Sequence, residues 1–199
     1  VAFDTLMQSL FSPHPYAWHP LGRRESLERI DRAALTAHYR RHYVPGGIVL
    51  AISGQVSAPA VLAEVERLFG AMPAGQPPVA TAARPPAMTA SRDLRDVAGA
   101  QTQILVSGLA PPLTHPDYPA VNVLGTVLGG GMAGRFFSEI RDKQGLAYST
   151  AARYPALGDT GYFLAQLGTA PENLSRAQAS LNKELDRIRE EPVSAEELR

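Results

Sequence analysis

A proline- and alanine-rich stretch near the middle of the chain does most to limit the folds open to it. Residues 71–92, AMPAGQPPVATAARPPAMTASR, contain five Pro and seven Ala. Proline lacks a backbone N–H and fixes φ, so such a stretch does not continue a helix or join a central strand, and it forms an extended, rather stiff connection. We therefore expect a linker over residues 73–92 that joins two lobes, residues 1–72 and 93–199.

Hydrophobic periodicity predicts helices and strands in both lobes, which makes the fold class α+β. The expected helices cover residues 2–11, 25–30, 31–42, 58–69, 116–129, 134–144 and 171–190. The expected strands cover residues 48–54, 101–108, 147–155 and 160–168. Among these, IVLAISG at 48–54 is apolar, rich in β-branched residues and bounded by glycines, so it indicates a buried strand. The stripe formed by Leu62, Val65 and Phe69 is expected on the inner face of its helix.

Composition excludes several classes of function. The chain has no cysteine, which excludes disulfides, thiolate zinc sites, iron–sulfur clusters and cysteine nucleophiles. Its 19 basic and 19 acidic residues give a formal net charge of zero without a block of like charges, so neither a nucleic acid nor a membrane is expected as a partner. None of these features identifies the compartment, and the periplasm and the cytoplasm both stay open.

Two histidines in the stretch HYRRH have the spacing of a metal motif. His38 and His42 lie four residues apart, so on a helix both rings project from one face, as in the zinc motif H-x-x-E-H. The position of the catalytic Glu is occupied by Arg41, which has no accessible base form. Arg40 and Arg41 also raise the local positive potential, which opposes a dication. We interpret the spacing as a coincidence and expect no metal ligand here.

The glycine-rich stretch GGGMAG, residues 129–134, matches the dinucleotide fingerprint G-x-G-x-x-G. That fingerprint must follow a strand, open a helix and have an acidic residue about 20 positions further on. Here the preceding AVNVLGTVL favours a helix, and the acidic residue is missing at that distance. A dinucleotide-binding domain therefore remains only a second alternative, beside the simpler reading of a tight turn between two helices.

A longer stretch around these glycines, LGGGMAGRFFSEIRDKQGLAYST at 128–150, closely resembles the zinc metallopeptidases of the pitrilysin/insulinase family, which include mitochondrial processing peptidase. Residues 14–56 resemble the segment that follows the zinc-binding half of the family's first domain. The resemblance implies two related α/β-sandwich lobes that close like a clamshell, each with an antiparallel or mixed sheet and helices on one face. Residues 1–72 would be the later part of the first domain, and residues 93–199 the first part of the second, inactive, substrate-binding domain.

The resemblance also implies which functional residues the chain lacks and which it keeps. The family's catalytic motif lies before the region where this chain begins, so no catalytic residue and no zinc ligand is implied here, and zinc is expected in the full-length protein or a partner. The family's Arg and Tyr, seven residues apart, correspond to Arg141 and Tyr148 in RDKQGLAY. They would donate hydrogen bonds to a substrate carbonyl or its oxyanion. Gly129, Gly130 and Gly131 resemble a loop that contacts substrate in some members.

Two hypotheses of different classes follow from the resemblance. In the first, the chain is a non-catalytic domain or subunit region of a zinc-dependent endopeptidase, and its partners are an extended peptide substrate and a catalytic zinc-binding domain or subunit, in a homo- or heterodimer. In the second, it is a purely structural or assembly module with no affinity for peptides. For the two residues themselves, spacing alone favours a simpler alternative, in which Arg141 pairs with Glu139 or Asp142 and Tyr148 packs on a strand.

Overall fold

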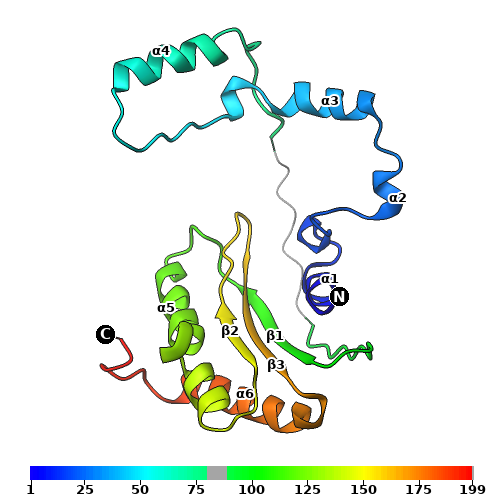
Figure 1. The fold of residues 1–199 in the computed structure, drawn as a ribbon, viewed down its shortest axis with the longest axis vertical. Helices are drawn as coiled ribbons and strands as arrows, with labels where there is room; N and C mark the ends of the chain where they lie inside the picture. Colours follow the sequence, from blue (N-terminus) through cyan, green and yellow to red (C-terminus); the bar gives the residue numbers. More distant parts are fainter. Residues whose placement is uncertain (80–88, 199) are drawn as a thin grey trace. The chain divides into compact units, whose positions relative to one another are not determined.

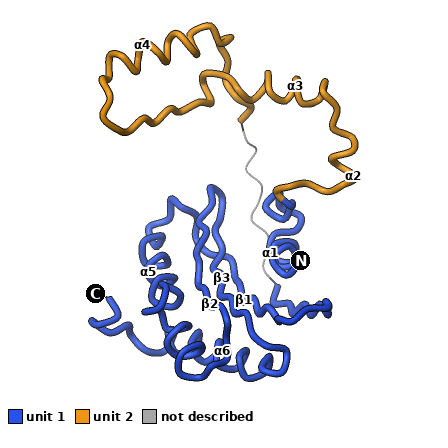
Figure 2. The backbone as a smooth tube through the Cα atoms, in the orientation of Figure 1, with its two compact units in different colours: residues 1–19, 83–199 blue, residues 20–82 orange. Residues whose placement is uncertain are grey.

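The computed structural model describes residues 1–79 and 89–198. It divides into two compact units, which Figure 2 colours separately: the first unit contains residues 1–19 and 83–199, and the second unit contains residues 20–82.

The predicted linker, residues 73–92, includes residues 80–88, which lie outside the described residues. The lobe boundaries at residues 72 and 93 refer to a larger two-domain arrangement and stay a prediction.

The first unit is built on a three-stranded antiparallel sheet with the strand order β1-β3-β2, visible in Figure 1. The strands span Thr102–Ala110 (β1), Ser149–Arg153 (β2) and Gly161–Thr169 (β3). In the register of the sheet, Thr102 lies opposite Thr169, and Ser149 lies opposite Gly168. Because β3 is the central strand, its backbone groups are paired on both sides and most of its residues are buried.

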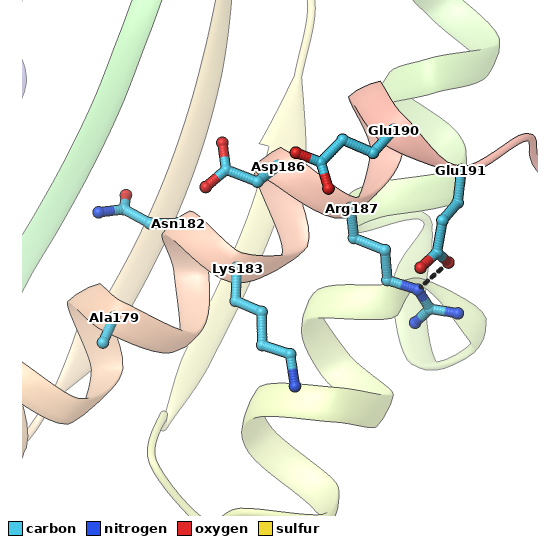
Figure 3. A pocket seen from close by; sticks show the side chains of 7 residues that line it. All are labelled: Ala179, Asn182, Lys183, Asp186, Arg187, Glu190 and Glu191. Atoms are coloured by element: carbon cyan, nitrogen blue, oxygen red, sulfur yellow. Dashed lines mark hydrogen bonds and ion pairs between the residues drawn. The ribbon is translucent and has the colours of Figure 1, made fainter.

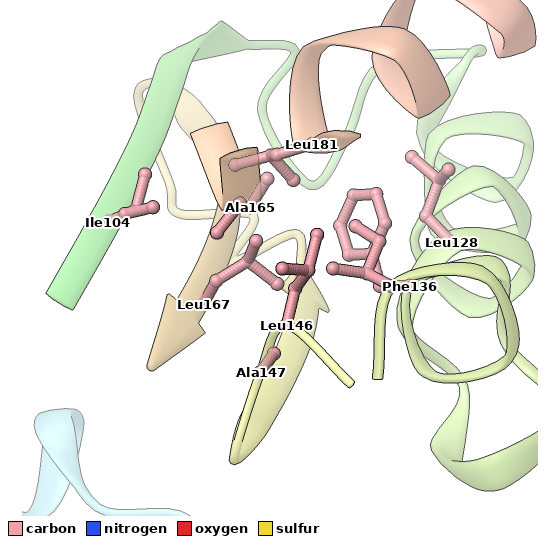
Figure 4. Close-up of a cluster of buried hydrophobic side chains, with 10 residues drawn as sticks. Ile104, Leu128, Phe136, Leu146, Ala147, Ala165, Leu167 and Leu181 are labelled. Atoms are coloured by element: carbon pink, nitrogen blue, oxygen red, sulfur yellow. The ribbon is translucent and has the colours of Figure 1, made fainter. Parts of the chain in front are cut away.

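The helices of the first unit lie on both faces of this sheet. They are α1 (Ala2–Phe11), η1 (Pro15–Ala17), α5 (Tyr118–Gly129), η3 (Gly131–Ala133), the π-helix η4 (Phe136–Asp142), η5 (Pro171–Asn173) and α6 (Leu174–Glu190). One face, with Ala165 and Leu167 of β3, packs against α5, η4 and α6 in the core drawn in Figure 4. The opposite face, with Tyr162 and Leu164, packs against Phe11 of α1.

The prediction of helices on one face of the sheet is therefore wrong for this unit, which has helices on both faces. Side chains alternate across a strand, and β3 carries apolar residues at both sets of positions, so each face of the sheet needs a cover. The α+β class and the antiparallel sheet are confirmed, while the clamshell arrangement of two lobes stays a prediction.

Local sequence signals explain why most of the expected helices form. The second unit contains α2 (Arg24–Leu27), α3 (Arg32–His42), η2 (Pro45–Gly47) and α4 (Ala58–Phe69). The carboxylate of Asp31 caps α3 by accepting a hydrogen bond from the Ala34 N–H at 2.7 Å.

No helix in the described part of the chain is long and apolar enough to cross a lipid bilayer.

The strand predicted over residues 48–54 is absent in the second unit. The segment begins with an extended backbone at Ile48 (φ −111°, ψ 128°). However, no described residue makes a backbone hydrogen bond with residues 49–53. A strand needs a neighbour that receives its N–H and C=O groups, and the described chain supplies none. The predicted inner face of α4 is likewise uncovered, since Leu62 and Phe69 are exposed.

Candidate functional site

A glycine-rich turn links α5 to the helix that carries Arg141. Gly129 ends α5 against β2, and a Cβ added there would lie 2.0 Å from the backbone N of Ala152. Only glycine permits this approach of helix to strand, so packing alone explains Gly129. Gly130 and Gly131 are exposed, and Gly131 has a φ of +67°, which also favours glycine. Contact of this turn with substrate stays a prediction.

The same turn does not have the surroundings of a dinucleotide site. The element before GGGMAG is the helix α5 and not a strand, so the glycines do not follow the end of a sheet strand as the fingerprint requires. The dinucleotide alternative is therefore wrong on its structural premise. The structure instead has the turn between two helices that the sequence left open.

Arg141 lies in the last turn of η4, with its side chain exposed. Its Cζ sits 5.0 Å from the centroid of the Phe137 ring, a cation–π contact one helical turn back. The neighbouring carboxylate of Glu139 is taken by Lys143, whose Nζ lies 2.8 Å from it. Within the described residues the Arg141 guanidinium makes no hydrogen bond or ion pair. The expected alternative, in which Arg141 pairs with Glu139 or Asp142, is therefore wrong, and its N–H donors face solvent.

Tyr148 lies immediately before β2, and the residue is 58% exposed. Its backbone N–H donates to the carbonyl of Gly168 at 2.8 Å, which fixes the residue at the edge of the sheet. The phenolic O–H has no hydrogen-bond partner among the residues the structure describes. Tyr148 thus has a fixed backbone and an available donor.

The segment between Arg141 and Tyr148 is held rigidly. The N–H groups of Gly145 and Leu146 donate to the carbonyls of Arg141 and Ile140, each at 3.0 Å. The carbonyl of Leu146 accepts a hydrogen bond from the buried Thr169 hydroxyl at 2.6 Å. Neither a hydrogen bond nor a cation–π contact joins the Arg141 and Tyr148 side chains, although the structure describes both residues. The Arg141 guanidinium and the Tyr148 hydroxyl, neither of which has a hydrogen-bond partner among the described residues, therefore lie at the two ends of a well-ordered turn.

Arg135, at the start of this helix, is a buried residue that the sequence analysis missed. Its Nε and Nη2 donate to the two carboxylate oxygens of Glu197 at 2.5 and 3.0 Å. Hydrogen bonds from Arg135 and from the backbone of Ser194 lower the pKa of Glu197 to about 2. The pair ties residues 194–197 to the helix that carries Arg141. The only sequence signal was a lone Arg in the otherwise apolar AGRFF, because Glu197 lies 62 residues away.

The histidine pair of HYRRH does not fit a zinc centre. The rings of His38 and His42 stack with centroids 4.2 Å apart on the exposed helix α3. The pKa of His42 is lowered, first by desolvation and then by the charges of His38 and Arg41. A zinc site needs at least three protein ligands, and no group of three His, Asp or Glu residues suited to a metal occurs in the described ranges.

A shallow pocket on α6, drawn in Figure 3, does not resemble a binding site either. All of its lining residues come from that helix and its C-terminal cap, and most of them are charged. The Nε of Arg187 donates to Glu191 at 2.9 Å, an exposed i, i+4 ion pair typical of a solvated helix face.

The three-stranded antiparallel sheet and the helices on both of its faces define an α+β domain. Residues 29–199 match the family model described as the peptidase M16 inactive domain. The chain therefore belongs to this family, which confirms its resemblance to the zinc metallopeptidases.

Relatives and solved structures agree with this assignment. An uncharacterized zinc protease of Streptomyces coelicolor is 30% identical over 204 residues, covering 98% of this chain and 44% of the relative. One of Mycobacterium leprae is 32% identical over 165 residues, covering 79% of this chain and 36% of the relative. The crystal structure of a peptidase M16 inactive domain from Pseudomonas fluorescens is 29% identical, with a TM-score of 0.86, over 99% of this chain and 48% of that one. The chain thus spans less than half the length of these relatives.

Proposed function

We propose that this chain contributes peptide-binding contacts to a zinc-dependent endopeptidase whose zinc ligands lie on another segment or another chain. The observation that carries the proposal is the set of contacts that the Arg141 guanidinium makes and leaves open. Its guanidinium lies against the Phe137 ring, while the carboxylate of Glu139 pairs with Lys143, so the N–H donors of Arg141 remain available.

The chemistry of the two exposed donors fits an extended peptide. A peptide backbone presents carbonyl oxygens at regular intervals, and the planar guanidinium of Arg141 offers a fork of donors to them. The phenolic O–H of Tyr148 adds a single donor from the edge of the sheet. Donors held on ordered backbone lose little freedom on binding, which favours contacts to a carbonyl or to the oxyanion formed from it.

In this proposal the zinc ligands lie outside this chain, in keeping with the lack of a group of three His, Asp or Glu residues suited to a metal in its described ranges. We use the term zinc-binding half for the part of a longer relative that lies outside the region matched by this chain. In the Streptomyces coelicolor zinc protease, the match covers 44% of the chain, which leaves ample length for such a half.

Peptide binding without cleavage tests the proposal. The chain is mixed with the zinc-binding half of the Streptomyces coelicolor relative in the presence of a chelator, and a fluorescent peptide is titrated by anisotropy. We expect Arg141→Ala and Tyr148→Phe each to weaken the peptide affinity by roughly three- to thirtyfold, the value of one or two hydrogen bonds to the peptide.

Matched controls are Arg189→Ala, which removes an exposed guanidinium on α6, and Tyr118→Phe, which removes a phenolic O–H on α5. Both controls should leave the affinity unchanged. If the wild-type mixture binds no peptide, or if the Arg141 and Tyr148 variants bind as well as the wild type, the chain is an assembly module instead.

A further inference from the structure

A polar side chain stands inside the central strand of the first unit. Apart from Gln166 and the terminal Thr169, the residues of β3 are apolar, aromatic or glycine. Gln166 is only partly buried, and its Nε2 donates a hydrogen bond to Oε1 of Gln103 on β1 at 3.2 Å. Apolar β-branched and aromatic residues are the usual occupants of such a strand. Core packing therefore does not explain a glutamine at this position.

Gln166 and Gln103 lie on the face of the sheet opposite to the core drawn in Figure 4. Residues two apart in a strand share a face, so Gln166 lies on the same face as Leu164, which packs against Phe11 of α1. The helix α1 thus covers the apolar part of this face. At the other end of the same face, Gln103 and Ser149 are exposed.

Gly168 brings the polar groups of this end together. In the register of the sheet, Gly168 lies between Gln103 on one side and Ser149 on the other. A Cβ added to Gly168 would lie 2.5 Å from Oγ of Ser149 and 3.1 Å from Nε2 of Gln103. Both polar groups therefore lie over the backbone of the central strand, in space that a side chain would fill. We use the term glutamine patch for Gln103, Ser149, Gln166 and Gly168.

The glutamine patch adjoins Tyr148. Tyr148 directly precedes Ser149, and its backbone N–H donates to the carbonyl of Gly168 at 2.8 Å. Extended chain advances about 3.3 Å per residue. A peptide whose carbonyl accepts the Tyr148 O–H would therefore bring the side chains of its neighbouring residues to the patch.

The open hydrogen-bonding groups of the patch define the ligand that fits it. After their mutual bond, the two amides keep Oε1 of Gln166 as an acceptor and Nε2 of Gln103 as a donor, and neither has a partner among the described residues. A carboxamide side chain carries the complementary donor and acceptor in one planar group. A carboxylate only accepts and an ammonium only donates, so each would leave one group of the patch unpaired. An apolar side chain would leave both unpaired.

We propose that the glutamine patch is a subsite that selects a glutamine or asparagine side chain of the peptide substrate. The proposal rests on the proposed function, because it assumes a peptide held at Tyr148. It adds a substrate class, an extended peptide with a carboxamide side chain close to the carbonyl that Tyr148 contacts. A site built from hydrogen-bonding groups discriminates against side chains that cannot pair with them.

Binding of a peptide series tests the subsite. The chain is mixed with the zinc-binding half of the Streptomyces coelicolor relative in the presence of a chelator, and binding is followed by anisotropy. The probes are fluorescent polyalanine peptides with terminal lysines, which carry a single Gln at successive positions, and matched peptides with Glu or Leu there. At one position we expect Gln to bind roughly three- to thirtyfold more tightly than Glu or Leu, the value of one or two hydrogen bonds. Equal affinities at every position, or no binding at all, would overturn the proposal.

Variants of Gln166 assign the preference to the patch. Gln166→Met keeps an unbranched side chain but removes the amide, so it should abolish the preference for Gln. The matched control is Gln178→Met, at another partly buried glutamine, on α6; this variant should keep the preference. Gln166→Glu leaves only acceptors at this position and should change the preference from Gln to Lys, a gain that misfolding cannot produce. An unchanged preference for Gln in Gln166→Met would overturn the proposal.

Association of the chain with the zinc-binding half, measured by calorimetry, separates a subsite from a contact between the two. Gln166→Met should leave this association unchanged. If the variant weakens the association and keeps the preference for Gln, the glutamine patch belongs to the contact and the subsite is wrong. Failure of the proposed function looks different, because Arg141→Ala and Tyr148→Phe would then leave the affinity for every peptide intact.

Discussion

Two glycines of α5, four residues apart, are predicted to respond to alanine in opposite directions. At Gly125 an added Cβ meets its nearest atom, Cε2 of Phe163, at 3.9 Å, which is ordinary van der Waals contact. At Gly129 the added Cβ lies 2.0 Å from the Ala152 N and 2.7 Å from its Cα. Ala152 is paired with Ala165 inside the sheet, so no side-chain rotation relieves the overlap.

The magnitudes follow from these contacts. Alanine stabilises a helix interior by up to about 1 kcal/mol relative to glycine, and a buried methyl adds about 0.8 kcal/mol, so Gly125→Ala should raise the free energy of unfolding by roughly 1 kcal/mol. At Gly129 the overlap with backbone outweighs propensity, because overpacking costs about 1–3 kcal/mol or more even where side chains can adjust. We expect Gly129→Ala to lower the free energy of unfolding by at least about 2 kcal/mol.

Urea unfolding followed by far-UV circular dichroism measures both variants. A difference of about 3 kcal/mol and a slope of about 1–3 kcal/mol per M separate the two midpoints by 1 M or more. If Gly129→Ala is as stable as the wild type, α5 does not approach β2 as closely as the structure has it, and the packing explanation for this glycine is wrong.

Three further predictions test the core, the Arg135–Glu197 ion pair and the histidine pair. Leu167→Ala in the central strand should cost about 3–4 kcal/mol, while Leu113→Ala at an exposed position should cost less than about 0.5 kcal/mol in the same urea assay. Because the pKa of Glu197 is lowered from 4.5 to about 2, its ion pair stabilises the chain fully above pH 4.5 and is lost as the pH falls through 2, so Glu197→Gln should cost about 1–2 kcal/mol at pH 7 and almost nothing near pH 2. Calorimetric titration with zinc should detect no tight stoichiometric site, and His42→Ala should not alter the result; one tightly bound zinc per chain would contradict this account.

Elements with a complete local signal could be predicted from the sequence. The Asp31 cap, the apolar stripes of α1 and α6, and the apolar runs of β1 and β3 are set by neighbours within a few residues, so these elements form close to their expected bounds. The strand expected over residues 48–54 had an equally good local signal. It failed because a strand also depends on a neighbour that pairs with it.

The site shows the same division between local and distant causes. The sequence shows the spacing of Arg141 and Tyr148. The contact of Arg141 with the Phe137 ring and the ion pair between Lys143 and Glu139 are seen only in the structure. The anchoring of residues 194–197 by Arg135 joins positions 62 residues apart, which periodicity cannot reveal. The packing role of Gly129 likewise depends on β2, a strand that follows only after the intervening helix.

The most direct test of the central claim is the rate of peptide hydrolysis by the zinc-binding half of the Streptomyces coelicolor relative, measured with and without this chain. We predict that the chain raises kcat/KM above that of the half alone. The double variant Arg141→Ala with Tyr148→Phe should reduce that gain at least tenfold, and the control variant Arg189→Ala should keep it. Equal stimulation by the double variant and the wild type would contradict the claim that this chain contributes substrate contacts.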